Sequence, residues 1–557
     1  MKINLLAYYI LIVFITLSSF IFPQTNYSEN QFNNPETVEW QEDLLYMAQE
    51  MPKIHNNLYH TTTEEQFHKS IDALYYKIPT LKRHQIIVEM EKIVASIGDG
   101  HTNIYPTRDK KIGFRRYPIK LYFFVEGLIV RSATDGEKNL IGSRVEKIGE
   151  FSVEEAYNSV SALIGQDNEM DAKYFAPFLL TIPEVINALG IVNDMENASF
   201  TFEKDGKLES VLLKPIDPVL LLASDTDISW KAEEGWIDAR KSSINQTPLW
   251  LKDPENKFWF EYLPDSQTVY VQVNQIGDKT SQTIEEFSTL LFEFIEENPV
   301  DLLILDLRLN RGGNGTLNRS LIRALIKSNK IDQIGKSYTI IGRSTWSAAQ
   351  FLCNDLERFS NTTFVGEPTG GKINHYGDSR KIILPNSGIT VRVSTLWWQE
   401  DERDNRYWIA PQLAANLTFN EYRNNIDPAL NAIFNYKPMK SLFELILDSA
   451  VVDSKFSARD VYKLWRSNPI NEYLDVESEL ISAGYSLIEN KKINCASEVF
   501  MLCAEIYPTS WNAYDSLAET YLTFGDTTNA IQYYNISLKL NPRNFNAIEI
   551  LKILNTN

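Results

Sequence analysis

Two residues whose side chains could carry out hydrolysis, Ser347 and Lys372, stand 25 residues apart. Ser347 lies at the start of a helix-like run in RSTWSAAQFLCNDLERF, and Lys372 ends the loop sequence FVGEPTGGK. A serine hydroxyl becomes a nucleophile when a base takes its proton, and a lysine can be that base where burial disfavours its charged form. Taken singly, Ser347 is better explained as a helix N-cap and Lys372 as a solvated loop residue.

A glycine-rich loop upstream changes this balance. The sequence DLRLNRGGNG offers backbone N–H groups without side-chain obstruction. Gly312 or Gly313, together with the N–H of Ala348, would hold the oxygen that becomes negative during acyl transfer. An ordinary strand-to-helix turn would need fewer glycines. The three features together therefore predict a nucleophile, a base and an oxyanion site.

Short apolar stretches precede each of these features. Residues 302–308, 338–343 and 362–367 are rich in Ile, Leu, Val or Phe, and they lead into the glycine loop, Ser347 and Lys372. If they are parallel strands, the three features meet at one sheet edge, where sites of α/β proteins are built. Strands and helices alternate from about 257 to 435, which predicts an α/β core, and residues 389–399 predict one more strand.

A phosphate-binding loop is the main competing interpretation of this segment. GEPTGGK, from Gly366 to Lys372, fits the first seven places of the pattern GxxxxGK. However, Ile373 stands where a Ser or Thr would bind magnesium, and NHYGDSRKIILP follows where a helix should start. A nucleotide hydrolase is therefore a poor interpretation.

The flanking regions differ in their predicted secondary structure. Residues 36–105 carry helical periodicity and end in IGDGHT, whereas 116–215 contain short strands and a hairpin signalled by Lys204-Asp205-Gly206. Residues 472–557 resemble two tetratricopeptide repeats, which predicts helical hairpins packed on the preceding domain. The positions that match at a spacing of 34 residues are Pro508 and Pro542, Ala496 and Ala530, Phe500 and Tyr534, and Gly484 and Ala518.

Several motifs occur in the order found in one peptidase family. IGDGHT, DLRLNRGG, RSTWSAAQ, FVGEPTGGKINHYGD, LPNSGITVRVSTLWWQ and NIDPAL resemble the tail-specific (C-terminal-processing) serine peptidases, which include relatives of the tricorn core protease. The resemblance covers roughly residues 36–435. It implies a multidomain α/β protein with a ClpP/crotonase-like core at 250–435, a helical N-terminal domain at 36–105 and an inserted PDZ-like module at 116–215. PDZ-like modules take up extended peptide C-termini by strand addition.

The family offers two kinds of base, and the chain keeps parts of both. In processing peptidases a lysine about 25 residues after the serine is the base, which Ser347 and Lys372 reproduce. In tricorn-like members a histidine from the upstream helical region is the base, and His101 in GDGHT matches this histidine. We expect Lys372 to be the base, with His101 as the alternative base or a site-lining residue. His375 is expected to line the same loop, and a surface turn explains it equally well. The acids that could orient His101 are Glu400, Asp401, Glu402 and Asp404.

Composition limits the partners. A formal charge of −19 argues against a broad nucleic-acid surface, and 44% hydrophobic residues among 557 suffice for several cores. The three cysteines, Cys353, Cys495 and Cys503, indicate neither a disulfide scaffold nor a zinc site. We expect no metal and no cofactor. The expected partners are a peptide or unfolded protein substrate and a protein partner at the tail.

The first residues predict export. Residues 1–24 place a lysine before a long apolar run at the extreme terminus, as in a secretory signal peptide. The run is nearly long enough to span a bilayer, so an uncleaved anchor is the second interpretation and the only route to a membrane. The expected location is the periplasm or cell envelope of a bacterium, or the medium.

The sequence as a whole predicts an exported serine endopeptidase that uses a Ser347/Lys372 dyad on peptides or unfolded proteins. Three alternatives stay open. One is a Ser/His peptidase with His101 as base. Another is a catalytically silent protein that binds peptides through its PDZ-like and tetratricopeptide-like modules. The third is a hydrolase of other acyl substrates on the same core.

Overall fold

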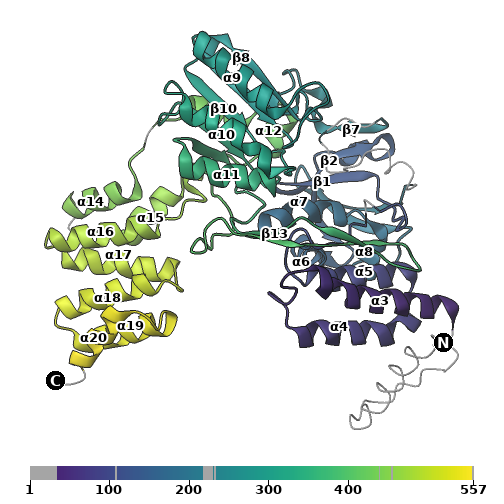
Figure 1. Ribbon diagram of the computed structural model, residues 1–557, viewed down its shortest axis with the longest axis horizontal. Helices are drawn as coiled ribbons and strands as arrows, with labels where there is room; N and C mark the ends of the chain where they lie inside the picture. Colours follow the sequence, from purple (N-terminus) through teal and green to yellow (C-terminus); the bar gives the residue numbers. More distant parts are fainter. Residues whose placement is uncertain are drawn as a thin grey trace, which may run out of the picture.

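The computed structural model describes residues 34–106, 109–216, 230, 234–437, 439–452 and 456–554. The described chain begins with the helices α3 (Pro35–Ile54), α4 (Glu64–Lys77) and α5 (Arg83–Ala95) (Figure 1). Helix α4 shows why a helix starts there, because Thr63 and Gln66 cap each other's backbone N–H groups. The predicted signal peptide, residues 1–24, lies outside the described residues. Within the described ranges, no helix has the length and apolarity needed to cross a membrane.

An antiparallel sheet follows these helices. The hairpin expected at Lys204-Asp205-Gly206 is present, with positive φ angles of 52° at Asp205 and 77° at Gly206. The sheet extends past the predicted boundary at 215, because β7 pairs with β2. Its elements are β1 (Ile119–Phe124), β2 (Gly127–Thr134), β3 (Arg144–Ile148), β4 (Phe151–Ser152), β5 (Ala198–Lys204), β6 (Lys207–Leu213) and β7 (Trp236–Asp238), with helices α6 (Val153–Ser161), α7 (Glu169–Leu179) and α8 (Pro183–Ala188).

The core is a second, mostly parallel sheet in the order β17-β12-β11-β10-β9-β8. The three apolar stretches expected to be parallel strands are β10, β11 and β12, and only β8 runs antiparallel to its neighbour. The strands are β8 (Phe258–Leu263), β9 (Thr268–Val273), β10 (Leu302–Asp306), β11 (Ser337–Ile341), β12 (Thr363–Gly366) and β17 (Leu413–Ala414).

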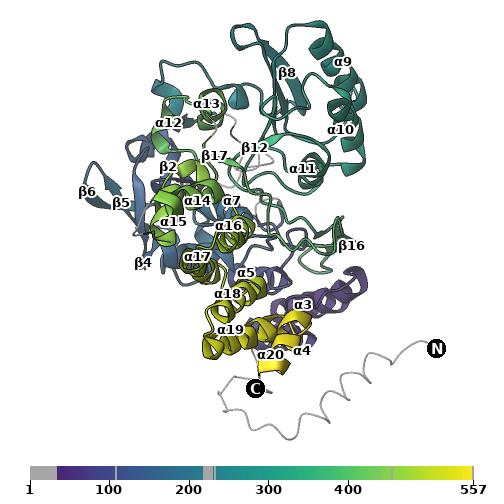
Figure 2. The same cartoon turned by 90° about the vertical axis from the view of Figure 1, so that its left-hand side faces the viewer.

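Helices cover both faces of this core sheet. Helices α9 (Ile284–Glu297), α10 (Asn318–Lys327) and α11 (Ala348–Phe359) bury their apolar sides against one face. Helix α13 (Pro428–Asn435) packs Ala429 and Ile433 on the other face. Figure 2 shows α9 and α10 on one side of the sheet and α13 on the other. The short helix α12 (Phe419–Arg423) precedes α13.

The segment expected to form one further strand of the core forms two short strands outside the core sheet instead. Residues 389–399 form two strands, β15 (Thr390–Val393) and β16 (Leu396–Trp398), and neither joins the core sheet. β15 pairs with β14 (Arg380–Ile383), and β16 pairs with β13 (His375–Gly377). The break falls at Ser394, whose hydroxyl donates to Asp99. We call residues 375–398 the arm.

The arm joins the core to the N-terminal part of the chain. Its residues Ile382 and Val391 belong to the same buried cluster as Met47 of α3, Val94 of α5 and Val130 of β2. The N-terminal helices, the antiparallel sheet and the outer half of the arm therefore share one hydrophobic core. We call this unit the N-terminal block.

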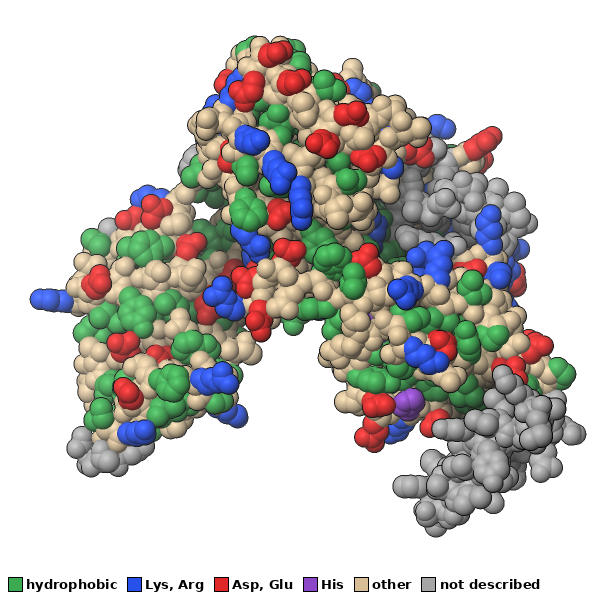
Figure 3. All heavy atoms as spheres, viewed as in Figure 1, with side chains coloured by type: hydrophobic (Ala, Val, Ile, Leu, Met, Phe, Trp, Pro, Cys, Tyr) green, Lys and Arg blue, Asp and Glu red, His purple; other side chains and the backbone are tan. Residues whose placement is uncertain are grey.

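A row of helices ends the chain. Gly484 permits close packing there, since a Cβ at this position would lie 2.4 Å from the Phe500 ring. The tetratricopeptide assignment of residues 472–557 stays a prediction. Figure 3 shows the row and the N-terminal block on either side of an open space below the core. The helices are α14 (Leu442–Val452), α15 (Ala458–Arg466), α16 (Glu477–Glu489), α17 (Ile493–Ile506), α18 (Trp511–Thr523), α19 (Thr527–Leu540) and α20 (Phe545–Leu554).

Candidate active site

Ser347 occupies the sharp turn between β11 and α11. Its backbone has φ 56° and ψ −123°, a region that residues with a side chain rarely adopt. Bonds of the preceding residues hold this turn: Trp346 N donates to Asn310 O at 3.1 Å, and the Thr345 hydroxyl donates to Leu307 O at 2.9 Å. The turn is therefore fixed to the loop that follows β10, and Ser347 lies at the carboxyl edge of the core sheet.

His101 is the residue in contact with this serine. Its Nε2 lies 3.1 Å from Ser347 Oγ, although 246 residues separate the two in sequence. The imidazole stacks on the Trp346 ring at 3.9 Å between centroids and 19° between planes. The Trp346 indole N–H in turn donates to Asp167 at 2.8 Å. The structure thus brings the sequence-predicted nucleophile together with the alternative base.

The surroundings of His101 favour its neutral form. Burial first, and then His375 and Arg311, lower its pKa to about 3, against the opposing influence of Asp99 and the Tyr376 backbone. A neutral imidazole can accept a proton, which is what a general base requires.

Asp99 holds the loop that carries His101. One carboxylate oxygen accepts the His101 backbone N–H at 2.9 Å and the Ser394 hydroxyl at 2.5 Å, and the other lies 3.1 Å from His55 Nε2. The Asn57 N–H donates to His55 Nδ1, so the proton of this imidazole sits on Nε2, facing Asp99. Burial alone would raise the pKa of Asp99, but hydrogen bonds from His55, Ser394 and Thr102 lower it to about 2.

The glycine loop lies directly against the serine turn. A Cβ at Gly312 would lie 2.8 Å from Ser347 Cβ and 2.9 Å from the nitrogen of Ala348. The Gly312 N–H already donates to the Asn310 side chain at 2.8 Å. Among the hydrogen bonds of the described residues, none uses the N–H of Gly313 or Ala348 as donor. These two groups are therefore the better oxyanion candidates.

Lys372 lies in a different position from the one a dyad needs. Its Nζ lies 5.1 Å from the centre of the Tyr407 ring. In the described part of the chain, no hydrogen bond joins Lys372 Nζ to Ser347 or His101. The side chain is half-buried.

His375 lies deeper than a surface turn would place it. It is 2% exposed, and its Nδ1 lies 3.0 Å from Lys372 O. Its ring is nearly parallel to Phe351 at 4.7 Å and to His101 at 5.9 Å. The rings of Trp346, His101, His375 and Phe351 therefore follow one another as a column beside Ser347.

The downstream acids do not contact His101 in the described structure. Asp404 pairs with Arg406, and Asn374 donates to the backbone carbonyls of Asp401 and Asp404, each at 2.7 Å. Burial raises the pKa of Glu400. Asp99 was within reach of sequence reasoning, because it belongs to the IGDGHT motif. Asp167, by contrast, has no motif around it.

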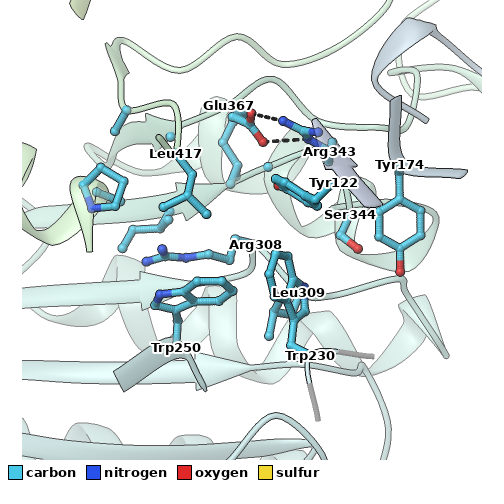
Figure 4. Close-up of a pocket in the computed structure, with 17 residues that line it drawn as sticks. Tyr122, Tyr174, Trp230, Trp250, Arg308, Leu309, Arg343, Ser344, Glu367 and Leu417 are labelled. Atoms are coloured by element: carbon cyan, nitrogen blue, oxygen red, sulfur yellow. Dashed lines mark hydrogen bonds and ion pairs between the residues drawn. The ribbon is translucent and has the colours of Figure 1, made fainter. Parts of the chain in front are cut away.

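A separate cavity of about 60 Å³ lies between the antiparallel sheet and the core (Figure 4). Arg343 pairs with Glu367 there, and Arg308 pairs with Asp427 at 2.9 Å. Both guanidinium groups are thus matched by carboxylates, and the cavity does not include Ser347. No group of three or more His, Cys, Asp and Glu side chains suited to a metal ion occurs among the described residues.

Comparisons with known proteins add the following. The mature CPAF structure with lactacystin has 11% identity and a TM-score of 0.48, and the match covers 72% of this chain and 98% of that one. The photosystem II D1 C-terminal processing protease has 14% identity, a TM-score of 0.32 and coverage of 68% and 93%. The tricorn protease has 15% identity, a TM-score of 0.32 and coverage of 71% and 36%.

Among curated proteins, no sequence match was found. The family model that matches is that of peptidase family S41, over residues 267–414. This segment includes the glycine loop, Ser347 and Lys372, but not His101. Residues 267–414 are therefore a serine-type peptidase domain of family S41.

Proposed function

We propose that this protein is an endopeptidase in which Ser347 is the nucleophile and His101 the general base. The observation that carries the proposal is the 3.1 Å contact between Ser347 Oγ and His101 Nε2. Burial lowers the pKa of His101 to about 3, so the imidazole is neutral at physiological pH and its Nε2 has a lone pair that can accept the serine proton as the attack proceeds. Lys372, expected from the sequence to be the base, is not the base in this proposal.

The mechanism follows from these positions. As Ser347 Oγ attacks the peptide carbonyl carbon, its proton moves to His101 Nε2, and the N–H groups of Gly313 and Ala348 donate to the oxyanion. The C–N bond then breaks, and His101 gives the proton to the leaving amine. Water, deprotonated by the same imidazole, releases the acyl group and restores Ser347.

The test compares cleavage of an unfolded protein and of a peptide library by purified residues 25–557 and their variants. Ser347→Ala and His101→Ala are expected to lose at least a thousandfold in kcat/KM, as members of such units do. Lys372→Met is expected to stay within about tenfold of the parent. His68→Ala, which changes an exposed histidine of α4, is the matched control.

Different results would change the assignment. Full activity in Ser347→Ala would overturn the proposal. Loss in Lys372→Met with activity retained in His101→Ala would restore the lysine base. Labelling of Ser347 by a fluorophosphonate without peptide cleavage would point to another acyl substrate. A chain that neither cleaves nor reacts would be a peptide-binding protein.

We also propose that residues 1–24 direct export, which rests on their apolar run behind a lysine. Fractionation of cells that express the full chain, followed by N-terminal sequencing, tests this. A mature protein outside the cytoplasm that begins near residue 25 is expected. An intact Met1 in the cytoplasmic fraction would contradict it.

A further inference from the structure

Two aromatic side chains, the half-buried Phe351 and the exposed Trp398, lie on one side of Ser347. Phe351 follows Ser347 by four residues in α11, so the two share a face of the helix. A Cβ at Gly315 would lie 3.3 Å from the Phe351 ring, which places this ring along the glycine loop. On its other side the Phe351 ring lies 5.5 Å from that of Trp398. An apolar surface thus starts next to the nucleophile and continues to the arm.

Trp398 reaches the same place from β16. It pairs with His375 of β13 across the arm. A Cβ at Gly377 would lie 3.2 Å from Trp398 Nε1 and 3.8 Å from His101 Cε1, so the indole and the imidazole flank the same glycine. The indole N–H donates to Asp378 at 2.8 Å, which fixes the ring, yet 38% of the residue is exposed.

The neighbouring Trp397 has the same chemistry and a different position. Consecutive residues of a strand point to opposite faces, so Trp397 points away from Phe351. Its ring lies 4.6 Å from Tyr376, and it is 44% exposed. The strand therefore offers two tryptophans of similar exposure, of which one borders Ser347 and His101.

We propose that Phe351 and Trp398 form the wall of a substrate subsite that binds a large apolar or aromatic side chain of the peptide. This inference rests on the proposed function, because it names the residues that such a peptidase selects. A fixed, exposed indole beside a second ring offers a partner for an aromatic side chain and apolar area for an aliphatic one. An acidic side chain would lose water there without gaining a partner, because the Asp378 side chain lies beside the indole.

The test measures binding and cleavage separately. Fluorescein-labelled peptides that differ at one position, with Phe, Leu, Ala or Glu, are titrated against the Ser347→Ala protein by anisotropy. We expect the Phe and Leu peptides to bind at least tenfold more tightly than the Ala and Glu peptides. Adding Trp398→Ala should remove most of this preference, and Trp398→Phe should keep it. Adding Trp397→Ala should leave it unchanged.

Cleavage of the same peptides by chains with an intact Ser347 separates the two proposals. If the wild type cleaves nothing, but its Ser347→Ala form binds aromatic peptides through Trp398, the catalytic proposal fails and the subsite stands. If the wild type cleaves and Trp398→Ala keeps the same profile, the subsite is wrong and the peptidase stands. No binding preference in the Ser347→Ala protein, or equal effects of Trp397→Ala and Trp398→Ala, would also overturn the subsite.

Discussion

At this site, backbone strain, a neutral imidazole and a charged carboxylate are found on three different residues. Ser347 adopts a positive φ of 56° because its neighbours Thr345 and Trp346 are bonded to the loop after β10. His101 is kept neutral by burial and by His375 beside it. Asp99 keeps its charge and holds the backbone under His101. The proton acceptor and the charged group that places it are therefore different residues.

The lowered pKa of His101 predicts an unusual pH profile. Since the imidazole stays neutral down to a pKa of about 3, kcat/KM should stay level from pH 8 to below pH 5, without a step near 6.5. An unfolded chain binds a proton at this histidine below about pH 6.5, so the fold should lose stability as the pH falls from there toward 3. Initial rates and urea unfolding across this range provide the check. Activity that keeps rising above pH 8 would instead indicate an amine base.

Asp99→Asn should weaken both the fold and the site. His55 and Ser394 would then face a neutral group in a buried position, which is expected to lower the free energy of unfolding by about 3 kcal/mol at pH 7. Because the folded-state pKa of Asp99 is lowered to about 2, the difference from the wild type should shrink as the pH falls from about 4 to 2. Urea unfolding of both proteins measures this. Asp72→Asn, at an exposed position of α4, should change little.

Among the secondary-structure elements, the loops that leave β10 and β11 build the site. The glycine loop passes so close to other backbone that side chains are excluded. A Cβ at Gly313 would lie 1.9 Å from the Ile276 carbonyl, and φ there is 139°. The parallel bridge between Ile276 and Gly313 ties this loop to the residues after β9.

Gly313→Ala should therefore disturb catalysis more than a glycine change elsewhere. Displacing an oxyanion donor typically lowers kcat by about a hundredfold or more, and the clash adds a loss of stability. Gly335→Ala is the matched control, because it also has positive φ, 78°, but open space around it. It should cost about 1 kcal/mol and leave kcat/KM unchanged. Thermal unfolding and kcat/KM are measured for both variants. Equal kcat/KM in Gly313→Ala and Gly335→Ala would contradict a special role of the glycine loop.

The sequence reveals those elements whose signals are local. The strands at 302–308, 338–343 and 362–367 were predictable because each is an apolar run, and the turn at Asp205-Gly206 because its residues tolerate positive φ. The contact of His101 with Ser347 was not predictable from such local signals, and only the resemblance of GDGHT to tricorn-like peptidases pointed to His101. The spacing from Ser347 to Lys372 produces no hydrogen bond between these two residues in the described structure, whereas His101, 246 residues before the serine, lies 3.1 Å from its Oγ. Such a contact leaves no periodicity in the sequence.

The chain brings Ser347 and His101, the two residues proposed to be catalytic, together through the packing of separate regions. Ser347 belongs to the core sheet, and His101 to the N-terminal block. The arm crosses between them, and Asp43 of α3 accepts the backbone N–H groups of Asn386 and Ser387 at its tip, each at 2.8 Å. Figure 1 shows this arm, labelled β13 at its base, between the core and the N-terminal helices.

Asp43→Ala should consequently act at a distance. Two partly buried backbone N–H groups would lose their carboxylate acceptor, which is expected to cost about 2–4 kcal/mol. A looser arm holds Gly377 and Trp398 less firmly beside His101, so kcat/KM should fall about tenfold. Glu36→Gln, at an exposed position of the same helix, should change stability by less than about 0.5 kcal/mol. Urea unfolding and peptide cleavage of both variants test this expectation. Unchanged values for Asp43→Ala would refute a role of Asp43 in holding the arm.

The arm also sets when the enzyme can begin to work during its own synthesis. The ribosome adds residues at about 5–20 per second, and His101 emerges well before Ser347. The N-terminal block cannot complete its core until Ile382 and Val391 have been added. A growing chain shorter than this carries only an open half of the site. Ser347 and His101 are therefore expected to come together only after residues 375–398 have been synthesised.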